Sequence, residues 1–144
     1  MTAPAAAQSK PARNAEHAYQ QALQLILQLA VSHQEAGRTL EAEQLYRGIL
    51  RGEPGQPQAN HNLGQLLLGL QQPAAGLTYL EAAVAAKPES ERYWLSYIDA
   101  LAQDGQTALA RERLAFAGEH GLEGEAAQAL TARLTAWRGR HFLA

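Results

Sequence analysis

Apolar side chains recur at helical spacing along most of the chain, and glycine and proline interrupt the pattern. In the first such stretch, residues 14–36, apolar positions return every three or four residues, which places them on one face of an α-helix. These positions are Tyr19, Leu23, Ile26, Leu27, Ala30 and Val31. A second helix follows Thr39 and stops at Gly52. Five more are predicted at residues 58–70, 73–86, 90–103, 107–120 and 123–138, which makes seven in total.

The breaks between these helices repeat at an interval of 34 residues. Pro54 and Pro88 end successive segments, and Gly37, Gln71 and Gly105 occupy equivalent positions in the turns. A fixed period of this length is the sequence signature of a helical-repeat protein. Because successive repeats bury each other's apolar faces, we expect stacked helical hairpins closed by a capping helix.

The period divides the chain into one repeat domain between two tails. We predict a flexible N-terminal tail at 1–13, a repeat domain at 14–138 and a C-terminal tail at 139–144. The repeats span 23–56, 57–90 and 91–124, and the capping helix spans 123–138. The capping helix carries Leu130, Leu134 and Trp137 on one side, which would cover the apolar face of the last hairpin.

The repeat resembles the tetratricopeptide repeat, a helix-turn-helix unit of 34 residues. The third repeat carries the family's early tryptophan as Trp94, its turn glycine as Gly105 and its small second-helix residue as Ala110. The other repeats supply Ala30, Gly37, Ala42, Tyr46 and Pro54, then Leu63, Gly64, Gly76 and Pro88. Three residues depart from the family's pattern: Gln71 replaces the turn glycine, Ile98 replaces a small residue, and Leu122 replaces the closing proline. The resemblance implies an all-α fold, a right-handed α-solenoid of three hairpins plus a C-terminal capping helix.

The family's first helices line a concave groove that binds peptides, and the resemblance therefore implies groove positions here. They are Gln24, Leu27, Val31 and Gln34, then Gln58, His61, Asn62, Gln65 and Leu68, then Arg92, Leu95, Ser96, Asp99 and Gln103. Each single residue also fits a plain solvated helix face. As a set, they leave apolar surface at Leu27, Val31, Leu68 and Leu95 among amides, which suits a partner helix or extended segment.

Some repeat domains of this family hold the acidic C-terminal tails of heat-shock chaperones with a clamp of Lys, Asn and Arg side chains. The equivalent positions here are Leu27, Val31, Asn62, Arg92 and Ser96. Only Asn62 matches, and Arg92 replaces a lysine with another cation. Without a cation in the first repeat, carboxylate capture loses its charge-assisted hydrogen bonds, so such a tail is disfavoured.

Two segments, Ala36–Tyr46 and Tyr93–Leu101, resemble the repeat arrays found ahead of bacterial glycosyltransferases and some sulfotransferases. Those glycosyltransferases include relatives of the O-linked N-acetylglucosamine transferase. The resemblance implies a bacterial protein and a role as the accessory repeat region of such an enzyme system.

Composition limits the partners and the compartment. With 144 residues, of which 47% are hydrophobic, the chain fits one domain with a substantial core. Its net charge of -2 provides no basic excess for nucleic acid. Neither a signal-peptide core nor an apolar run of about 18 residues is present, so we expect no membrane partner and a cytoplasmic location.

The sequence contains no recognisable catalytic motif. The histidines, His17, His33, His61, His120 and His141, form no pair at metal-ligand spacing, and cysteine is absent. The glycines are spaced as turns rather than as a phosphate-binding loop, and no serine lies in a Gly-x-Ser-x-Gly elbow. We therefore predict no enzyme activity, no catalytic residue, no metal and no cofactor.

The sequence favours a non-catalytic protein-interaction scaffold that binds a peptide or helix of a partner protein. Two alternatives stay open: the accessory region of a glycosyltransferase, and an assembly domain that self-associates through the Trp137 end. His61 further predicts pH-dependent binding near its typical pKa of about 6.5.

Overall fold

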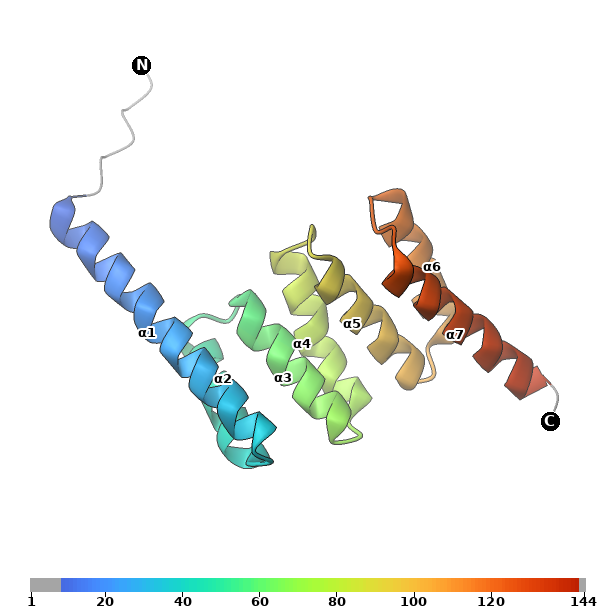
Figure 1. Cartoon of the computed structure of the whole chain (residues 1–144), viewed down its shortest axis with the longest axis horizontal. Coiled ribbons are helices and arrows are strands. Elements are labelled where there is room, and N and C mark those ends of the chain that lie inside the picture. The colour runs from blue at the N-terminus through green and yellow to red at the C-terminus, as the bar shows by residue number, and fades with distance from the viewer. Residues whose placement is uncertain (1–8, 143–144) are drawn as a thin grey trace, which may run out of the picture. The chain divides into compact units, whose positions relative to one another are not determined.

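The computed structural model describes residues 9–142, and within that range the chain forms seven α-helices and no strand (Figure 1). They are α1 (Lys10–Glu35), α2 (Thr39–Gly52), α3 (Pro57–Gly69), α4 (Pro73–Ala86), α5 (Glu91–Gln103), α6 (Thr107–Glu119) and α7 (Glu125–Phe142). The predicted number of helices and the all-α class are confirmed. Among the described residues, no helix combines the length and the apolar character needed to cross a membrane.

The helix starts keep the period of the sequence. The second helices of the hairpins start at Thr39, Pro73 and Thr107, and the first helices α3, α5 and α7 start at Pro57, Glu91 and Glu125. Each set is spaced by 34 residues, the repeat length read from the sequence. The capping helix α7 therefore begins where the first helix of a fourth repeat would begin.

Two helix ends differ from the prediction by more than two residues. Helix α1 begins at Lys10 rather than Asn14, because Pro11 lies in its first turn, where a fixed φ and a missing N–H suit a helix. Helix α7 continues to Phe142, so residues 139–142 are helical rather than part of a tail. The rest of both predicted tails, residues 1–8 and 143–144, lies outside the described residues.

The chain forms two compact units, and the boundary between Leu45 and Tyr46 lies within α2. In the first unit, the buried side of α1 consists of Leu23, Leu27 and Ala30. Ile26 was predicted on that side but is 39% exposed. The buried stripe of α1 is therefore narrower than the sequence pattern indicated.

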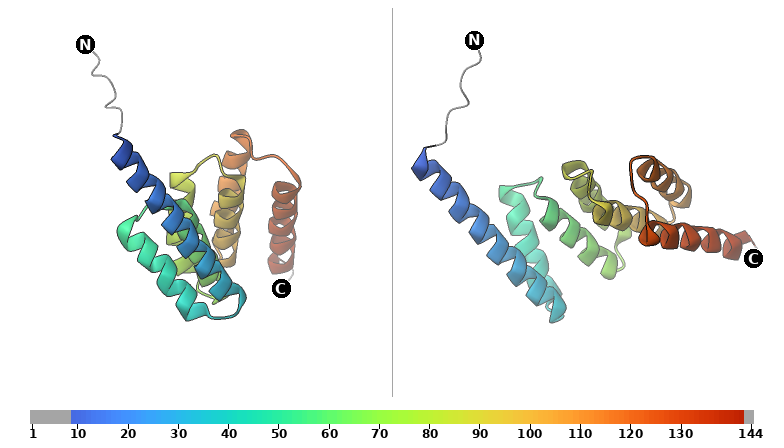
Figure 2. Two further views of the ribbon diagram at one scale, coloured as in Figure 1. Left: turned by 60° about the vertical axis from the view of Figure 1, so that its left-hand side comes forward. Right: turned by 45° about the horizontal axis from the view of Figure 1, so that its top comes forward.

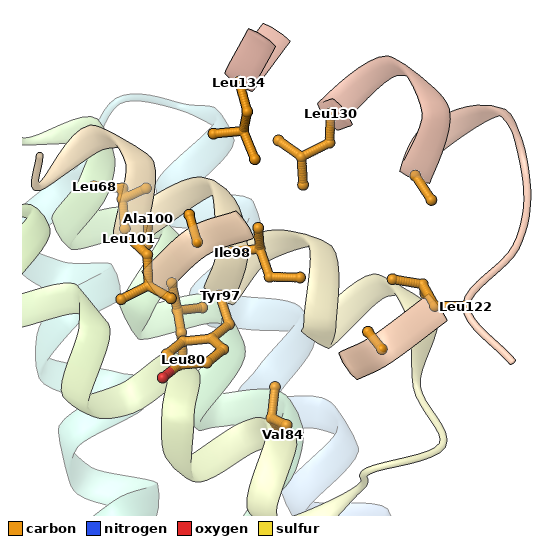
Figure 3. Close-up of a cluster of buried hydrophobic side chains, with 13 residues drawn as sticks. Leu68, Leu80, Val84, Tyr97, Ile98, Ala100, Leu101, Leu122, Leu130 and Leu134 are labelled. Atoms are coloured by element: carbon orange, nitrogen blue, oxygen red, sulfur yellow. The ribbon is translucent and has the colours of Figure 1, made fainter. Parts of the chain in front are cut away.

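The core of the second unit joins side chains from α3 to α7 (Figure 3). It contains Leu68, Leu80, Val84, Tyr97, Ile98, Ala100, Leu101, Ala110, Ala117, Leu122, Ala127, Leu130 and Leu134. Leu130 and Leu134 come from α7, so this helix covers the last hairpin as predicted. The side chain of Trp137, the third residue of that predicted surface, lies outside the described side chains.

Two glycines allow α3 and α4 to pack backbone against backbone. A Cβ on residue 76 would lie 2.8 Å from the carbonyl oxygen of Gly64, and a Cβ on residue 64 would lie 2.5 Å from Cγ of Leu80. No side chain larger than glycine fits at either position without movement of its neighbours. The small residues at Ala30, Ala42, Ala83, Ala110 and Ala117 are likewise buried.

The turn between α3 and α4 places a glutamine in the left-handed conformation. Gln71 has φ 61°, whereas the equivalent turn residues Gly37 and Gly105 have φ 77° and 81°. The Gln72 amide donates to the Leu67 carbonyl at 2.9 Å, and the Gln71 amide donates to the Leu68 carbonyl at 3.0 Å. These two hydrogen bonds form the helix-ending motif that normally uses glycine at its left-handed residue.

We expect Gln71→Gly to stabilise the protein by about 0.5–1 kcal/mol, because it relieves the left-handed strain without removing a buried side chain. Gly105→Ala is the reciprocal control and should destabilise by about 1 kcal/mol. Urea unfolding followed by circular dichroism measures both changes. A Gln71→Gly variant no more stable than wild type would contradict this account of the turn.

Candidate functional site

The predicted groove residues lie on three helices. Gln24, Leu27, Val31 and Gln34 lie on α1 in the first unit, and the other ten lie on α3 and α5 in the second. Helices α3 and α5 lie side by side, joined by hydrogen bonds between their side chains (Figures 1 and 2). The second unit therefore brings the second and third predicted sets together, and a role of the α1 residues in binding stays a prediction.

The link between α3 and α5 is centred on one hydroxyl group. Ser96 Oγ on α5 accepts a hydrogen bond from Gln65 Nε2 at 2.6 Å and lies 2.7 Å from His61 Nε2. The His61 ring stacks on Tyr93, with centroids 4.7 Å apart and planes 28° apart. These contacts hold the facing sides of α3 and α5 in a defined geometry.

The hydrogen bonds favour one neutral form of His61. Nδ1 lies 3.4 Å from Asn62 Oδ1, which can only accept, so the ring proton belongs on Nδ1. Nε2 then accepts from the Ser96 hydroxyl. Burial lowers the pKa of His61 and the positive charge of Arg92 lowers it further, while the hydrogen bond with Asn62 opposes both.

Two of the four apolar residues that were predicted to be exposed in the groove are buried. Leu27 is 1% exposed and Leu68 is 6% exposed. Leu68 is turned toward α4, since a Cβ added at residue 76 would lie 2.9 Å from the Leu68 Cδ1 atom. Val31 and Leu95 are partly exposed, so they are the two apolar positions that keep accessible surface.

The polar surface of α5 extends to α7 through an ion pair that sequence reasoning missed. Arg133 donates to Asp99 at 2.8 Å, and Gln103 donates to the same carboxylate at 3.0 Å. Arg133 lies 34 residues after Asp99, so the repeat interval could have identified it. It was overlooked because α7 was interpreted only as a cap.

The accessible part of this surface forms the α3/α5 face, which we define as Gln58, Asn62, Gln65, Arg92, Leu95 and Asp99. Gln65 and Arg92 are exposed, and the other four are partly exposed. A shallow hollow of about 430 Å³ lies along α5, lined by Glu91, Arg92, Leu95 and Ser96. The face therefore offers amide groups, one guanidinium, one carboxylate and one leucine.

A larger hollow, of about 520 Å³, lies between α6 and α7 and was not predicted. Its lining includes Leu114, Leu122, Thr131 and Leu134, with Arg111 at one side. Arg111 donates to the Leu134 carbonyl at 2.9 Å, so its guanidinium already serves to hold α7. The hollow has mainly apolar walls, with polar side chains at Arg111, Glu123, Gln128, Thr131 and Thr135, and none of its lining residues belongs to the α3/α5 face.

The His61–Ser96 contact has the spacing of a base and a nucleophile, but its surroundings do not suit catalysis. Gln65 donates to the oxygen that would have to attack. Ser96 lies in the middle of α5, where backbone N–H groups are used within the helix and cannot form an oxyanion hole. In the described part of the chain, no three His, Asp or Glu side chains are placed to hold a metal ion.

The fold defines a helical-repeat protein, and comparison identifies the type of repeat in part of the chain. Residues 33–95 match the family model described as tetratricopeptide repeat. That match covers the end of α1, helices α2 to α4 and the start of α5. Together with the 34-residue spacing of the helices, this match shows tetratricopeptide repeats within residues 33–95, and the chain has an all-α solenoid fold. No curated protein matches the sequence significantly.

Several solved structures share the fold. The first repeat domain of Spaghetti (RPAP3), bound to an HSP90 peptide, has TM-score 0.72 and 14% identity, over 83% of this chain and 94% of that one. The Yersinia enterocolitica type III secretion translocator chaperone SycD has TM-score 0.67 and 16% identity, over 84% and 83%. A Thermobaculum terrenum O-GlcNAc transferase mutant has TM-score 0.61 and 27% identity, over 67% of this chain and 19% of that chain.

The buried histidine predicts a pH-dependent stability. Because the pKa of folded His61 is lowered, the unfolded state binds the extra proton, and stability is lost as the pH falls below about 6.5. We expect the free energy of unfolding to fall more steeply between about pH 6.5 and pH 5 in wild type than in His61→Gln. Urea unfolding across this range measures the difference, and equal slopes would contradict a buried neutral imidazole.

Proposed function

We propose that the chain is a non-catalytic protein-interaction scaffold and that its α3/α5 face binds a segment of a partner protein. The observation that supports this most is the side-chain link between the two helices, in which Ser96 contacts both Gln65 and His61. A face held in one geometry loses little conformational entropy on binding. It therefore suits recognition of a defined segment.

The chemistry of the face indicates the kind of segment. Gln58, Asn62 and Gln65 follow one side of α3 at helical spacing, and each amide can both donate and accept. Such a row can bond the main-chain groups of an extended segment, while Leu95 offers an apolar contact. We propose an uncharged, extended or helical segment as the ligand.

An acidic tail is a poorer fit. Arg92 is the one cation among the six residues of the face, and Arg133 of α7, which contacts the face at Asp99, is paired with that carboxylate. Carboxylate recognition depends on charge-assisted hydrogen bonds, which a single guanidinium supplies only at one point. The likeness to the HSP90-peptide-bound domain is 14% identical and supports the fold rather than the ligand.

The setting of this function is part of the proposal. A bacterial, cytoplasmic protein is favoured by the resemblance of its repeats to bacterial arrays and by its composition. Peptide binding by similar folds supports the general function, since SycD has been solved with a peptide of the translocator YopD.

The face can be tested with a charge-matched pair of triple variants. The test variant carries Asn62→Arg, Arg92→Glu and Leu95→Glu, and the control carries Thr78→Arg, Lys87→Glu and Ala85→Glu at exposed positions elsewhere. Both sets change the net charge equally, and both variants are first shown to fold by circular dichroism. We expect affinity capture from cells of the source organism to retain a partner with wild type and control.

The test variant should bind that partner at least tenfold more weakly, a loss of about 1.4 kcal/mol or more. The reason is that charges replace an amide and a leucine, and a carboxylate replaces the guanidinium. Calorimetry with the captured partner measures the ratio. Equal affinity for the test variant and the control would refute binding at the α3/α5 face.

A second function is favoured by one comparison. The 27% identity to the O-GlcNAc transferase mutant covers 67% of this chain, but only 19% of that protein. We propose as the alternative that the chain is the accessory repeat region of a glycosyltransferase system. Captured complexes should then transfer N-acetylglucosamine to protein acceptors, whereas the purified chain alone should not. Complexes without transferase activity would exclude this alternative.

A further inference from the structure

Helix α1 is twice as long as the other first helices of this protein. It has 26 residues, whereas α3 and α5 have 13 each. Residues 23–35 correspond to α3 and α5 in the 34-residue register, so residues 10–22 are an extension that those helices lack. The repeat architecture does not account for this extension.

The side of α1 away from Leu23 and Leu27 is also apolar, and it is exposed. Leu25 is 66% exposed, Leu29 is 50% exposed and Ile26 is 39% exposed. Alanines at 15, 18 and 22 continue the same side into the extension and are exposed as well. Figure 2 shows α1 as one continuous helix, so this surface runs without a break.

The exposed residues follow a seven-residue pattern. Ala15, Ala22 and Leu29 are spaced by seven, and Ala18 and Leu25 lie three residues after the first two. We call these five residues the outer stripe. This is the a and d pattern of a helix that pairs lengthwise with another helix. The e and g positions beside it, from residue 14 to residue 33, contain no Asp, Glu, Lys or Arg, so pairing with an identical helix brings no like charges together.

The order of large and small residues selects the partner and its direction. If two α1 helices run antiparallel, Ala22 of one faces Leu25 of the other, and Ala18 faces Leu29. Each of these layers then combines one small and one large side chain, which fills the space between the helices evenly, while Ala15 faces Ser32 at either end of the pair. A parallel pair would face each of the three alanines with its own copy and each of the two leucines with its own copy, so small layers would gather in one half of the interface and large layers in the other. Opposed helix dipoles also favour the antiparallel arrangement.

We propose that two copies of this chain associate through antiparallel pairing of their α1 helices along the outer stripe. This interface uses the same surface on both copies, as a twofold-symmetric dimer requires. It does not involve the α3/α5 face, so it adds an assembly surface to the proposed scaffold. It also differs from self-association at the Trp137 end.

The first test compares the mass of the full chain and of two double variants by sedimentation equilibrium over a range of concentrations. Leu25→Glu with Leu29→Glu should raise the dimer dissociation constant at least 100-fold. Leu40→Glu with Leu70→Glu changes two leucines that are 63% and 41% exposed elsewhere, and it should leave the dimer intact. A monomeric wild type, or a dimer unaffected by the first pair, would overturn the proposal.

The second test determines direction. The chain has no cysteine, so single cysteines can be introduced without background. When Ala18→Cys and Leu29→Cys variants of different mass are mixed and oxidised, disulfides should form between the two variants and not between identical copies. Disulfides between identical copies would overturn the antiparallel arrangement, and the absence of any disulfide would overturn pairing along the stripe.

Discussion

The contact between the backbones of α3 and α4 controls the arrangement of the second unit. Gly64 and Gly76 face each other so closely that a Cβ on residue 76 would lie 2.8 Å from the Gly64 carbonyl oxygen. Leu80 and Leu68 fill the space on either side of this contact and continue into the core (Figure 3). Because packed helices move little relative to each other, this contact also fixes the side of α3 that faces α5.

The position of His61 follows from that packing. With α3 fixed, the imidazole lies between Tyr93 and Ser96 of α5 and is buried. A polar group in such a place is tolerated when its hydrogen bonds are made, which is the case here through Ser96 and Asn62. The repeat pattern assigned His61 to the groove-facing side of α3, but it could not reveal that the Tyr93 ring covers the imidazole.

Periodicity predicted the helices well because each break has a local cause. Pro73 lies in the first turn of α4, and Ser90 caps the N-terminus of α5. The Ser90 hydroxyl accepts a hydrogen bond from the Tyr93 amide at 3.3 Å. Exposure was predicted less well, because a residue's angle around a helix does not determine what packs beside it. Leu27 and Leu68 show this limit: both belong to the groove pattern, yet both are buried. For Arg133 the sequence was sufficient, because the 34-residue interval places it opposite Asp99.

Helix α1 carries two apolar stripes, one buried within its own unit and one exposed. The helical spacing of Leu23, Leu27 and Ala30 explains why this helix packs within its own chain, but it does not explain the remaining apolar residues. The leucines at 25 and 29 are instead regularly spaced on a different side. Since exposed apolar surface is costly in water, its persistence over several turns favours a partner. The order of the outer stripe, three alanines followed by two leucines, fits an identical helix running in the opposite direction, which gives the extension of α1 a role in the proposed assembly.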